Sequence, residues 1–362
     1  MENFNCFESK YNKQSNFFNV DFFSTSTESS SKSSSDSLTK PFIGEIDLHI
    51  FLINVKTHQG SMTYQYLLNT YSPQEINTLL FQISPFLIEI MCSEYGNYFF
   101  QRLVHKLNLN QRLHVISLIA KHFIPICANK SGTYSIQALI SAIKTQQEED
   151  ILRLLIGRNL VFLFTNENAH HIIQKIIIDY PEEKRTYINQ FIFDNIDKIC
   201  INEYGSLCVV KFINFNTNLL IRVELIKSIN IKFFNMLTNK YGCNIILYMM
   251  EKFGNGYSGF VFCEIKNNLV YCSNSNKVSV PLVIKVLNYM NKCFRYNFIN
   301  LVWDLLKDEN TLLTLMKCEG GVDIIMTLLK NATSEQKDFF KKKNYTDLKH
   351  KLAENKLILL LI

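Results

Sequence analysis

The stretch Ser93-Glu94-Tyr95-Gly96-Asn97-Tyr98-Phe99-Phe100-Gln101 decides the fold, because its pattern returns along the chain at a nearly fixed period. The pattern consists of a helix-capping residue, two variable positions, a small residue and a block of five residues. The small residue recurs every 36 or 37 positions, at Gly60, Gly96, Gly132, Ala169, Gly205 and Gly242. Looser copies follow at Val280 and Gly321. This period is typical of solenoids, so we expect eight repeats, six clear and two degraded.

Each repeat is predicted to be helical. An Asn, Ser or Thr stands three residues before the small position, where its side chain can accept hydrogen bonds from the free N–H groups of a helix start. The apolar residues that follow have helical spacing, as at Phe100, Leu103, Val104 and Leu107. A second apolar helix lies between blocks and should end near Pro125 in one repeat. We therefore expect an all-α solenoid with two helices per repeat, in which the small residue admits the backbone of the neighbouring repeat.

Composition limits the classes of protein that remain. The chain has 362 residues, of which 47% are hydrophobic, and a formal net charge of +6. The hydrophobic content suffices for a large core, and the charge permits an anionic partner without requiring one. No apolar run approaches the roughly 18 residues of a membrane span, and no secretory signal opens the chain. We therefore expect no membrane segment.

The 10 cysteines include no C-x-x-C pair. Four of them recur just before a small residue, namely Cys92, Cys127, Cys200 and Cys318. This position favours buried apolar side chains over metal ligands or disulfides, and a reduced, intracellular protein.

Residues 1–41 differ in composition from the rest. Residues 24–37 are almost entirely Ser and Thr, which predicts disorder. Several aromatic residues lie upstream, and they form either a short partner-binding segment or a tail without function. We expect a disordered tail over residues 1–41 and a repeat domain over residues 42–362, in which the apolar run 357–362 caps the last repeat.

The five-residue block places three side chains along one helix edge. In α-helical geometry Asn97 and Gln101 share a face, Tyr98 projects beside them, and the third and fourth residues point into the core. We expect this edge to be exposed. Two amides beside an aromatic ring can hydrogen-bond the edge of a nucleic-acid base and stack on its face.

The trio recurs in three other repeats. Its members are Ser61, Met62 and Gln65; Thr133, Tyr134 and Gln137; and His170, His171 and Gln174. In a single repeat, a Gln on a solvated face and a Tyr covering core would be the simpler interpretation. Four Gln residues in one register favour a function, because packing alone does not require them.

These residues make the chain similar to the Pumilio, or PUF, family of RNA-binding proteins over roughly residues 43–329. The resemblance rests on Gly96-Asn97-Tyr98 with Gln101, on Gly60-Ser61 with Gln65, and on their counterparts. It implies a right-handed, armadillo-like superhelix of about eight repeats. It also implies that each repeat reads one base with its first and fifth block residues and stacks it on the second. The first repeat would lie at the RNA 3′ end.

Carried over repeat by repeat, the resemblance implies a target sequence. Ser61 with Gln65 and Thr133 with Gln137 would read adenine, and Asn97 with Gln101 would read uracil. For His170 with Gln174 it fixes no base, and a tolerant uracil site is one interpretation. The expected partner is single-stranded RNA, such as a messenger RNA 3′ untranslated region containing A-U-A, with protein co-repressors as further candidates.

The last four repeats depart from the pattern, because none has Gln or Glu at the fifth position. The weaker candidates there are Ser206, Leu207, Val210, Cys243, Asn244 and Leu247. The last two repeats have Pro281 with Lys285 and Val322 with Met326 at the first and fifth positions. The family reads U-G-U with its last repeats, and that recognition does not carry over here. Basic residues directly after the block, at Arg102, Lys175 and Lys211, either approach phosphates or are solvated surface charges.

Other motifs are weak. Residues 254–259 match G-x-G-x-x-G, but they follow an apolar helix rather than a strand, and we expect a loop. His170 and His171 are adjacent on a helix and point about 100° apart, so both cannot easily bind one metal. No catalytic constellation stands out. We expect no enzyme activity, metal, cofactor or small-molecule substrate.

Three functions remain open. The first is cytoplasmic, sequence-selective binding of messenger RNA, with post-transcriptional control through translational repression or decay. The second is nucleolar binding of pre-ribosomal RNA with low specificity, which the degraded second half favours and the modest charge opposes. The third is a protein–protein scaffold that has lost RNA binding, against which the intact Asn97, Tyr98 and Gln101 argue.

Overall fold

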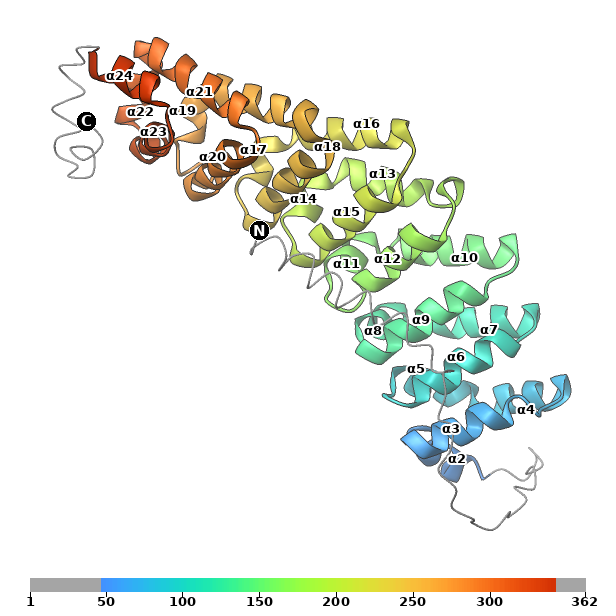
Figure 1. Cartoon of the computed structure of the whole chain (residues 1–362). Coiled ribbons are helices and arrows are strands. Elements are labelled where there is room, and N and C mark those ends of the chain that lie inside the picture. Colours follow the sequence, from blue (N-terminus) through green and yellow to red (C-terminus); the bar gives the residue numbers. More distant parts are fainter. Residues whose placement is uncertain (1–46, 343–362) are drawn as a thin grey trace, which may run out of the picture. The chain divides into compact units, whose positions relative to one another are not determined.

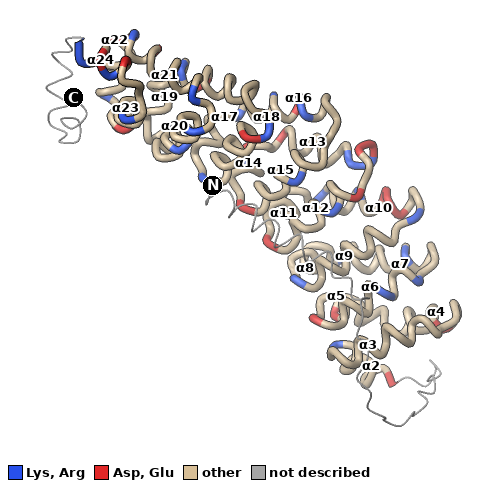
Figure 2. Tube along the Cα trace, in the orientation of Figure 1, with Lys and Arg blue, Asp and Glu red and all other residues tan. Residues whose placement is uncertain are grey.

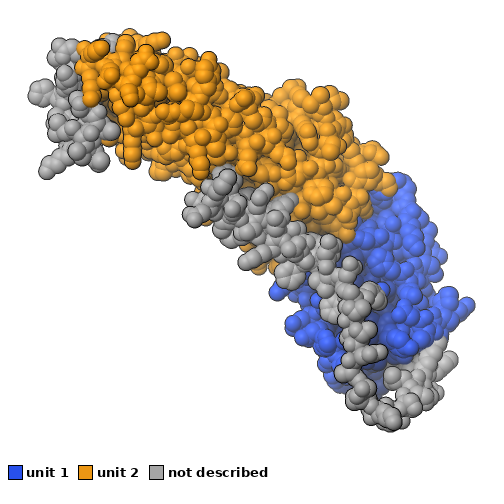
Figure 3. Space-filling view, viewed as in Figure 1, with its two compact units in different colours: residues 1–155 blue, residues 156–362 orange. Residues whose placement is uncertain are grey.

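The computed structural model describes residues 47–342, and every regular element in that range is helical (Figure 1). The all-α repeat solenoid expected from the sequence is confirmed. The expected tail over residues 1–41 and the apolar run 357–362 lie outside the described residues. The chain divides into two compact units, Met1–Leu155 and Ile156–Ile362 (Figure 3).

The described repeats contain three helices each, not the two expected, because a short helix precedes the two longer ones. We call these the short, second and third helix of a repeat. In the first unit the short helices are α2 (Leu48–Val55), α5 (Leu87–Cys92) and α8 (Phe123–Ala128). The second helices are α3 (His58–Leu67), α6 (Gly96–Lys106) and α9 (Lys130–Ala142). The third helices are α4 (Pro73–Ile83), α7 (Leu109–Ala120) and α10 (Gln146–Gly157), with η3 (Ser84–Phe86) after α4.

The second unit continues the order over five repeats. Its short helices are α11 (Leu160–Thr165), α14 (Ile196–Cys200), α17 (Phe233–Met236), α19 (Leu269–Cys272) and α22 (Glu309–Lys317). Its second helices are α12 (His170–Asp179), α15 (Glu203–Phe215), the first part of α18 (Lys240–Asn267), α20 (Val280–Cys293) and α23 (Gly321–Lys330). Its third helices are α13 (Thr186–Asp194) after η4 (Glu182–Lys184), α16 (Leu219–Ile231), the second part of α18, α21 (Arg295–Lys307) and α24 (Ser334–Lys342).

Local hydrogen bonds fix where the second helices begin. The side chains of Asn129, Asn166 and Asn202 each accept two backbone N–H groups of the turn that follows. Thr57, Ser93 and Asn239 each accept one. The predicted caps are confirmed, and they place the five-residue block on the same turn of each second helix.

The small residue makes its close contact inside its own repeat, not with the neighbouring repeat as we expected. A Cβ atom added to Gly132 would lie 2.3 Å from the carbonyl oxygen of Ile126, at the end of the short helix α8. At Gly205 the corresponding oxygen, of Ile199, would lie 2.4 Å away. The missing side chain therefore lets the second helix begin directly against the end of the short helix.

Two other boundaries differ from the expectation. The helix expected to end near Pro125 ends at Ala120, and Pro125 lies in the first turn of α8, where its missing N–H costs no helical hydrogen bond. Residues 254–259 are helical rather than a loop. The helix α18 is interrupted only at Gly254, whose φ of 61° and ψ of −140° suit glycine. The G-x-G-x-x-G stretch is therefore a kinked helix and not a phosphate-binding turn.

Second helices of successive repeats pack side by side within each unit. The order is α3, α6 and α9 in the first unit, and α12, α15, α18, α20 and α23 in the second (Figure 1). The row of second helices is the surface on which the five-residue blocks lie.

One stretch, Pro73–Cys92, is long and apolar enough to cross a membrane by length and composition, although we expected none. The structure divides it into α4, η3 and α5. Its apolar residues contribute to the core of the first unit, as at Leu79, Leu80, Ile83, Leu87 and Ile90. Core helices of globular proteins pass the same test, so the stretch is weak evidence for a membrane span.

The recurring cysteines lie at or near the core. Cys127 and Cys200 are buried as expected, whereas Cys92 and Cys318 are half-buried. Burial raises the pKa of the Cys127 and Cys200 thiols, which keeps them protonated and unreactive.

Candidate nucleic-acid interface

In α6 and α9 the third and fourth residues of the block lie in the core, and the second residue faces outward. In α6, Phe99 and Phe100 are buried while Tyr98 is 53% exposed. In α9, Ile136 is buried and Tyr134 is 38% exposed. This part of the predicted geometry is confirmed.

The expectation that the first residue of the block is exposed is wrong. In the six clear repeats this residue is buried, at Ser61, Asn97, Thr133, His170, Ser206 and Cys243. In α6 the reason is visible, because the Asn97 amide folds back on its own first turn. Its Nδ2 donates to the carbonyl oxygens of Ser93 and Glu94 at 2.9 and 2.7 Å. The side chain is thereby fixed with Oδ1 turned toward the fifth residue.

The first and fifth residues form a hydrogen-bonded pair in the first two repeats. Gln101 Nε2 donates to Asn97 Oδ1 at 2.8 Å, and Gln65 Nε2 donates to Ser61 Oγ at 3.1 Å. Ser61 in turn donates to the carbonyl oxygen of Tyr95 in the next repeat at 2.8 Å. Each half-buried Gln is held in place by one N–H, and its carbonyl oxygen finds no partner within the described residues.

The third repeat holds a buried amide with no partner at all. Gln137 is only 4% exposed, and neither Nε2 nor Oε1 has a hydrogen-bond partner among residues 47–342. An unpaired buried polar group of this kind costs about 1–3 kcal/mol. Such groups are rare in folded proteins, and a ligand that supplies the missing donor and acceptor is one physical reason to retain one.

Three flat or flexible side chains stand beside these polar positions. Met62, Tyr98 and Tyr134 are exposed on the neighbouring helices α3, α6 and α9. The pKa of Tyr134 is raised by burial and then by its electrostatic interaction with Tyr98, which indicates that the two hydroxyls are near one another. Exposed aromatic rings on successive repeats are suited to stacking on bases.

The fourth repeat, in the second unit, is arranged differently. The His170 ring is buried and donates from Nδ1 to the carbonyl oxygen of Asn166 at 3.2 Å, so Nε2 is an acceptor without a partner. The His171 ring lies 4.0 Å from that of His170, centroid to centroid. Gln174 makes no hydrogen bond to His170 within the described residues, and its interaction with His171 partly offsets the lowering of the His171 pKa by burial. The pair of first and fifth residues seen in α3 and α6 is therefore absent from α12.

The histidines of the fourth repeat are neutral at physiological pH. Burial, followed by the charge of His171, lowers the pKa of His170 to about 3. Burial also lowers the pKa of His171. A ligand at this repeat would therefore meet neutral rings.

In the fifth and sixth repeats the first and fifth block residues form no polar pair. Ser206 donates its hydroxyl to the carbonyl oxygen of Glu203 at 2.7 Å, and the fifth residues Val210 and Leu247 are buried. Cys243 is buried too. Leu207 and Asn244, at the second position, are half-buried. Apart from the amide of Asn244, these weaker candidates offer apolar contact or a hydroxyl that is already bonded.

The three basic residues after the block have different surroundings. Arg102 is exposed, as expected for either interpretation. Lys175 forms an ion pair with Asp179 at 2.6 Å. Lys211 is only 8% exposed and lies over the ring of Phe215, so it is not a solvated charge, and burial lowers its pKa. Charges of both signs are interspersed along each unit (Figure 2).

A recurring tyrosine was missed in the sequence. It precedes the small residue at Tyr95, Tyr204 and Tyr241. The ring of Tyr204 lies 5.1 Å from that of His170 in the preceding repeat, and the ring of Tyr95 lies 5.5 Å from that of His58. These rings extend the aromatic surface across repeat boundaries, and their regular spacing could have revealed them.

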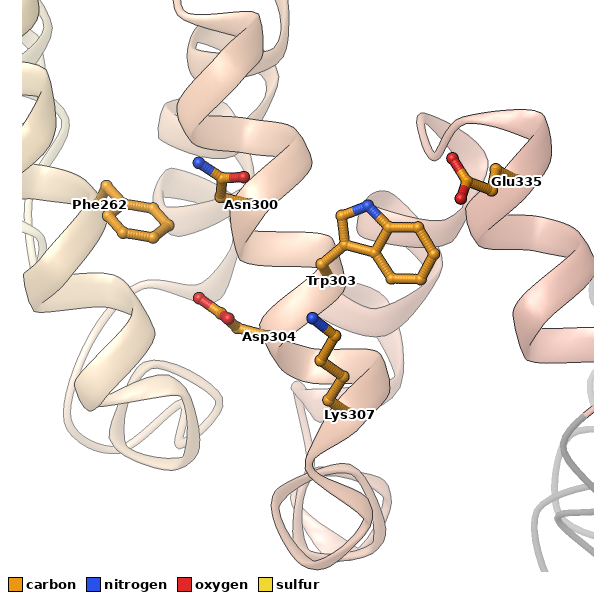
Figure 4. Close-up of a pocket in the computed structure, with 6 residues that line it drawn as sticks. All are labelled: Phe262, Asn300, Trp303, Asp304, Lys307 and Glu335. Atoms are coloured by element: carbon orange, nitrogen blue, oxygen red, sulfur yellow. The ribbon is translucent and has the colours of Figure 1, made fainter.

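An open pocket of about 490 Å³ lies away from the row of second helices. It is lined by Phe262 from α18, by Asn300, Trp303, Asp304 and Lys307 from α21, and by Glu335 from α24 (Figure 4). These are third helices, so the pocket is separate from the five-residue blocks.

Comparison with known proteins points to one family. A family model described as a Pumilio-family RNA binding repeat matches residues 87–120 and 232–266. The protein named pumilio homolog 8 of Arabidopsis thaliana is 23% identical over 71% of this chain and 50% of its own length. A Pumilio domain-containing protein of Schizosaccharomyces pombe is 24% identical over 78% of this chain and 40% of its own. The chain thus spans half or less of these relatives.

Solved structures of the same family share the fold. The PUM-HD domain of Schizosaccharomyces pombe Puf1, solved in complex with RNA, aligns with a TM-score of 0.64 at 16% identity, covering 90% of this chain and 82% of that one. The RNA-binding domain of yeast Puf5p, bound to AAT2 RNA, aligns with a TM-score of 0.56 at 20% identity, covering 88% and 91%.

Proposed function

The chain is a divergent member of the Pumilio family, and we propose that it binds single-stranded RNA along the second helices of its repeats. Two proteins with this fold, yeast Puf5p and Schizosaccharomyces pombe Puf1, were solved with RNA bound, which supports the proposal. The site residues of this chain supply the chemistry on which it rests.

The observation that carries the proposal is the repeated arrangement in α3, α6 and α9. In each helix, polar residues at the first and fifth block positions lie beside an exposed second residue that can stack on a base. In α6 these are Asn97, Gln101 and Tyr98. A base in single-stranded RNA exposes a hydrogen-bonding edge and a flat face, and these helices offer a match to both. The unpaired amide of Gln137 is the position that gains most from a ligand.

We further propose that the first repeats select a sequence containing A-U-A. The resemblance to the family assigns adenine to Ser61 with Gln65, uracil to Asn97 with Gln101, and adenine to Thr133 with Gln137. In the uracil site the Asn97 amide is fixed by two carbonyl oxygens, so the orientation of Gln101 is set before RNA arrives. Such preorganisation reduces the entropic cost of binding.

The cellular role that fits this chemistry is post-transcriptional control of messenger RNA in the cytoplasm, with recruitment of protein co-repressors that reduce translation or promote decay. A related protein, Puf4, was solved with a 3′ UTR recognition sequence, which supports this role. A reporter messenger RNA with A-U-A sites in its 3′ untranslated region should be expressed less when the protein is present. Equal expression of this reporter and of one with A-C-A sites would contradict the role.

Binding of the full chain to short RNAs tests the proposal. One RNA contains A-U-A and the other A-C-A, and the wild type is compared with Asn97→Ala/Gln101→Ala. We expect the wild type to prefer A-U-A by about tenfold, or about 1.4 kcal/mol, and the double variant to lose this preference. Equal binding of both RNAs by the wild type would contradict base selection.

The second unit favours an alternative in which RNA is bound with little sequence preference, as in a nucleolar protein that binds pre-ribosomal RNA. Its fifth positions are apolar at Val210 and Leu247, and they cannot recognise a base edge. Salt dependence separates the two functions, because binding through phosphates alone weakens steeply with salt. A steep slope together with equal affinity for A-U-A and A-C-A would favour the alternative.

A further inference from the structure

One side-chain pair connects the blocks of the sixth and seventh repeats. Lys285, the fifth block residue on α20, donates from Nζ to Oδ1 of Asn244 at 2.8 Å. Asn244 is the second block residue on α18. The pair therefore lies on the row of second helices, where the neighbouring fifth residues Val210 and Leu247 are apolar.

The ammonium group of Lys285 is an exposed charge without a carboxylate partner among residues 47–342. The helix that carries it, α20, contains no Asp or Glu. Some other lysines of the second unit are paired with carboxylates, as Lys175 is with Asp179 and Lys266 with Asp304. The positive charge at Lys285 is therefore available to a ligand.

The pair has hydrogen-bond donors left over. Asn244 Oδ1 accepts the bond from Lys285, which leaves the two Nδ2 hydrogens of the amide outside this bond. The ammonium keeps two further N–H groups. A ligand with acceptors only and a negative charge matches this set, because charge-assisted hydrogen bonds are the stronger ones. In RNA the phosphate is such a group and carries the negative charge, whereas most base edges combine donors and acceptors or, like N7 and O6 of guanine, are uncharged.

We propose that Lys285 and Asn244 form a phosphate-binding site, through which the second unit holds the RNA backbone independently of base sequence. This inference rests on the proposed RNA binding. The repeats of the first unit would then select bases, and the later repeats would bind the RNA backbone.

The test compares the full chain with Lys285→Gln, which keeps the length of the side chain and removes its charge. The probes are an A-U-A core RNA and the same core lengthened at either end by adenosines, by uridines or by abasic nucleotides, each measured at several salt concentrations. We expect one end to increase affinity when lengthened, equally for the three extensions. Lys285→Gln should lose that increase and lower the salt slope by about 0.7, the value for one phosphate of a single strand. Lys285→Arg should retain both.

A matched control is Lys227→Gln, because Lys227 is exposed on the third helix α16 and pairs with Glu224. It should leave affinity and salt slope unchanged. An increase seen with uridines alone would overturn the phosphate assignment in favour of a base carbonyl. An unchanged salt slope in Lys285→Gln would also overturn the site, and the Asn97→Ala/Gln101→Ala result then shows whether base selection stands by itself. A wild type that binds none of the RNAs would overturn both proposals.

Discussion

The first and second units share the same three-helix repeat but differ in the side chains that they place on the second helices. At the fifth position of the second helices, the first unit has Gln65, Gln101 and Gln137, whereas the second unit has Gln174 in its first repeat and then the buried Val210 and Leu247. The repeat forms with either kind of residue at this position. The fifth position therefore accepts polar and apolar side chains, so its residue can differ between repeats without a change of fold.

A related contrast appears where an arginine links successive repeats, between the third helices α7 and α10 in the first unit and between the N-cap of α13 and the C-cap of α15 in the second. In the first unit, Arg112 bonds the carbonyl oxygen of Leu107 at 2.6 Å and both carboxylate oxygens of Glu148. In the second unit, Arg185 bonds the carbonyl oxygen of Ile177 at 2.7 Å and the neutral Oδ1 of Asn216 at 2.9 Å. Both arginines are buried, so one link is an ion pair and the other a single charge with neutral partners.

The largest expected effect comes from breaking the ion pair. Glu148→Ala leaves the buried Arg112 charge uncompensated, so we expect a loss of about 3–5 kcal/mol in unfolding free energy. Asn216→Ala removes one neutral acceptor and should cost about 1–3 kcal/mol. Urea unfolding of both variants measures the two values. A larger loss for Asn216→Ala than for Glu148→Ala would refute this comparison.

The link of the first unit should also respond to acid. Burial raises the pKa of Glu148, but hydrogen bonds from Arg112, Thr145 and the N–H of Lys144 outweigh it and lower the pKa from 4.5 to about 2. Because the folded pKa is the lower one, this group stabilises the fold fully above pH 4.5, and the stabilisation is lost as pH falls toward 2. The total is roughly 3 kcal/mol.

Hydrogen exchange at pH 5 and at pH 3 locates this response. Amides of α7 and α10 should lose more protection on acidification than those of α13 and α16, because Asn216 does not titrate. Glu148→Gln is the control and should remove the difference between the units. If its α7 amides keep the wild-type pH response, another carboxylate is responsible.

The smallest expected effect comes from exchanging the residue type at the fifth block position. Gln137→Leu gives the first unit a residue of the second-unit type and removes an unpaired buried amide. We expect the free protein to gain about 1 kcal/mol in stability while its affinity for A-U-A RNA falls. Thermal unfolding and RNA binding of one preparation measure both. Val210→Leu, at an already apolar fifth position, should leave RNA affinity unchanged, and a loss of stability in Gln137→Leu would show that the amide has a partner.

Much of the fold could be predicted because its signals are local. The capping side chains of Asn129 and Asn202 accept hydrogen bonds from N–H groups two and three residues away. The period of the small residues can be counted directly in the sequence. The short helices were missed because elements such as α17, with four residues, hold too few apolar positions to show a period. The helix count per repeat was therefore wrong although the repeat count was correct.

The site was predicted in part for a related reason. Helical spacing places Asn97 and Gln101 on one face, and they do form a pair. Spacing does not tell what covers that face, so the burial of the first position was missed. Contacts between repeats, such as Lys285 with Asn244, join residues 41 positions apart and have no signature within a single repeat.

The small residue packs directly against the end of the short helix. The position of the five-residue block therefore does not depend on the length of the connecting segments. Gly132 and Gly205 each meet a carbonyl oxygen only six residues upstream, and the capping residue lies between the two. A residue gained or lost in a connecting segment therefore leaves the start of the next second helix unchanged. Spacings of 36 and 37 residues can coexist in one array for this reason, and whole repeats are natural units for duplication, loss or exchange.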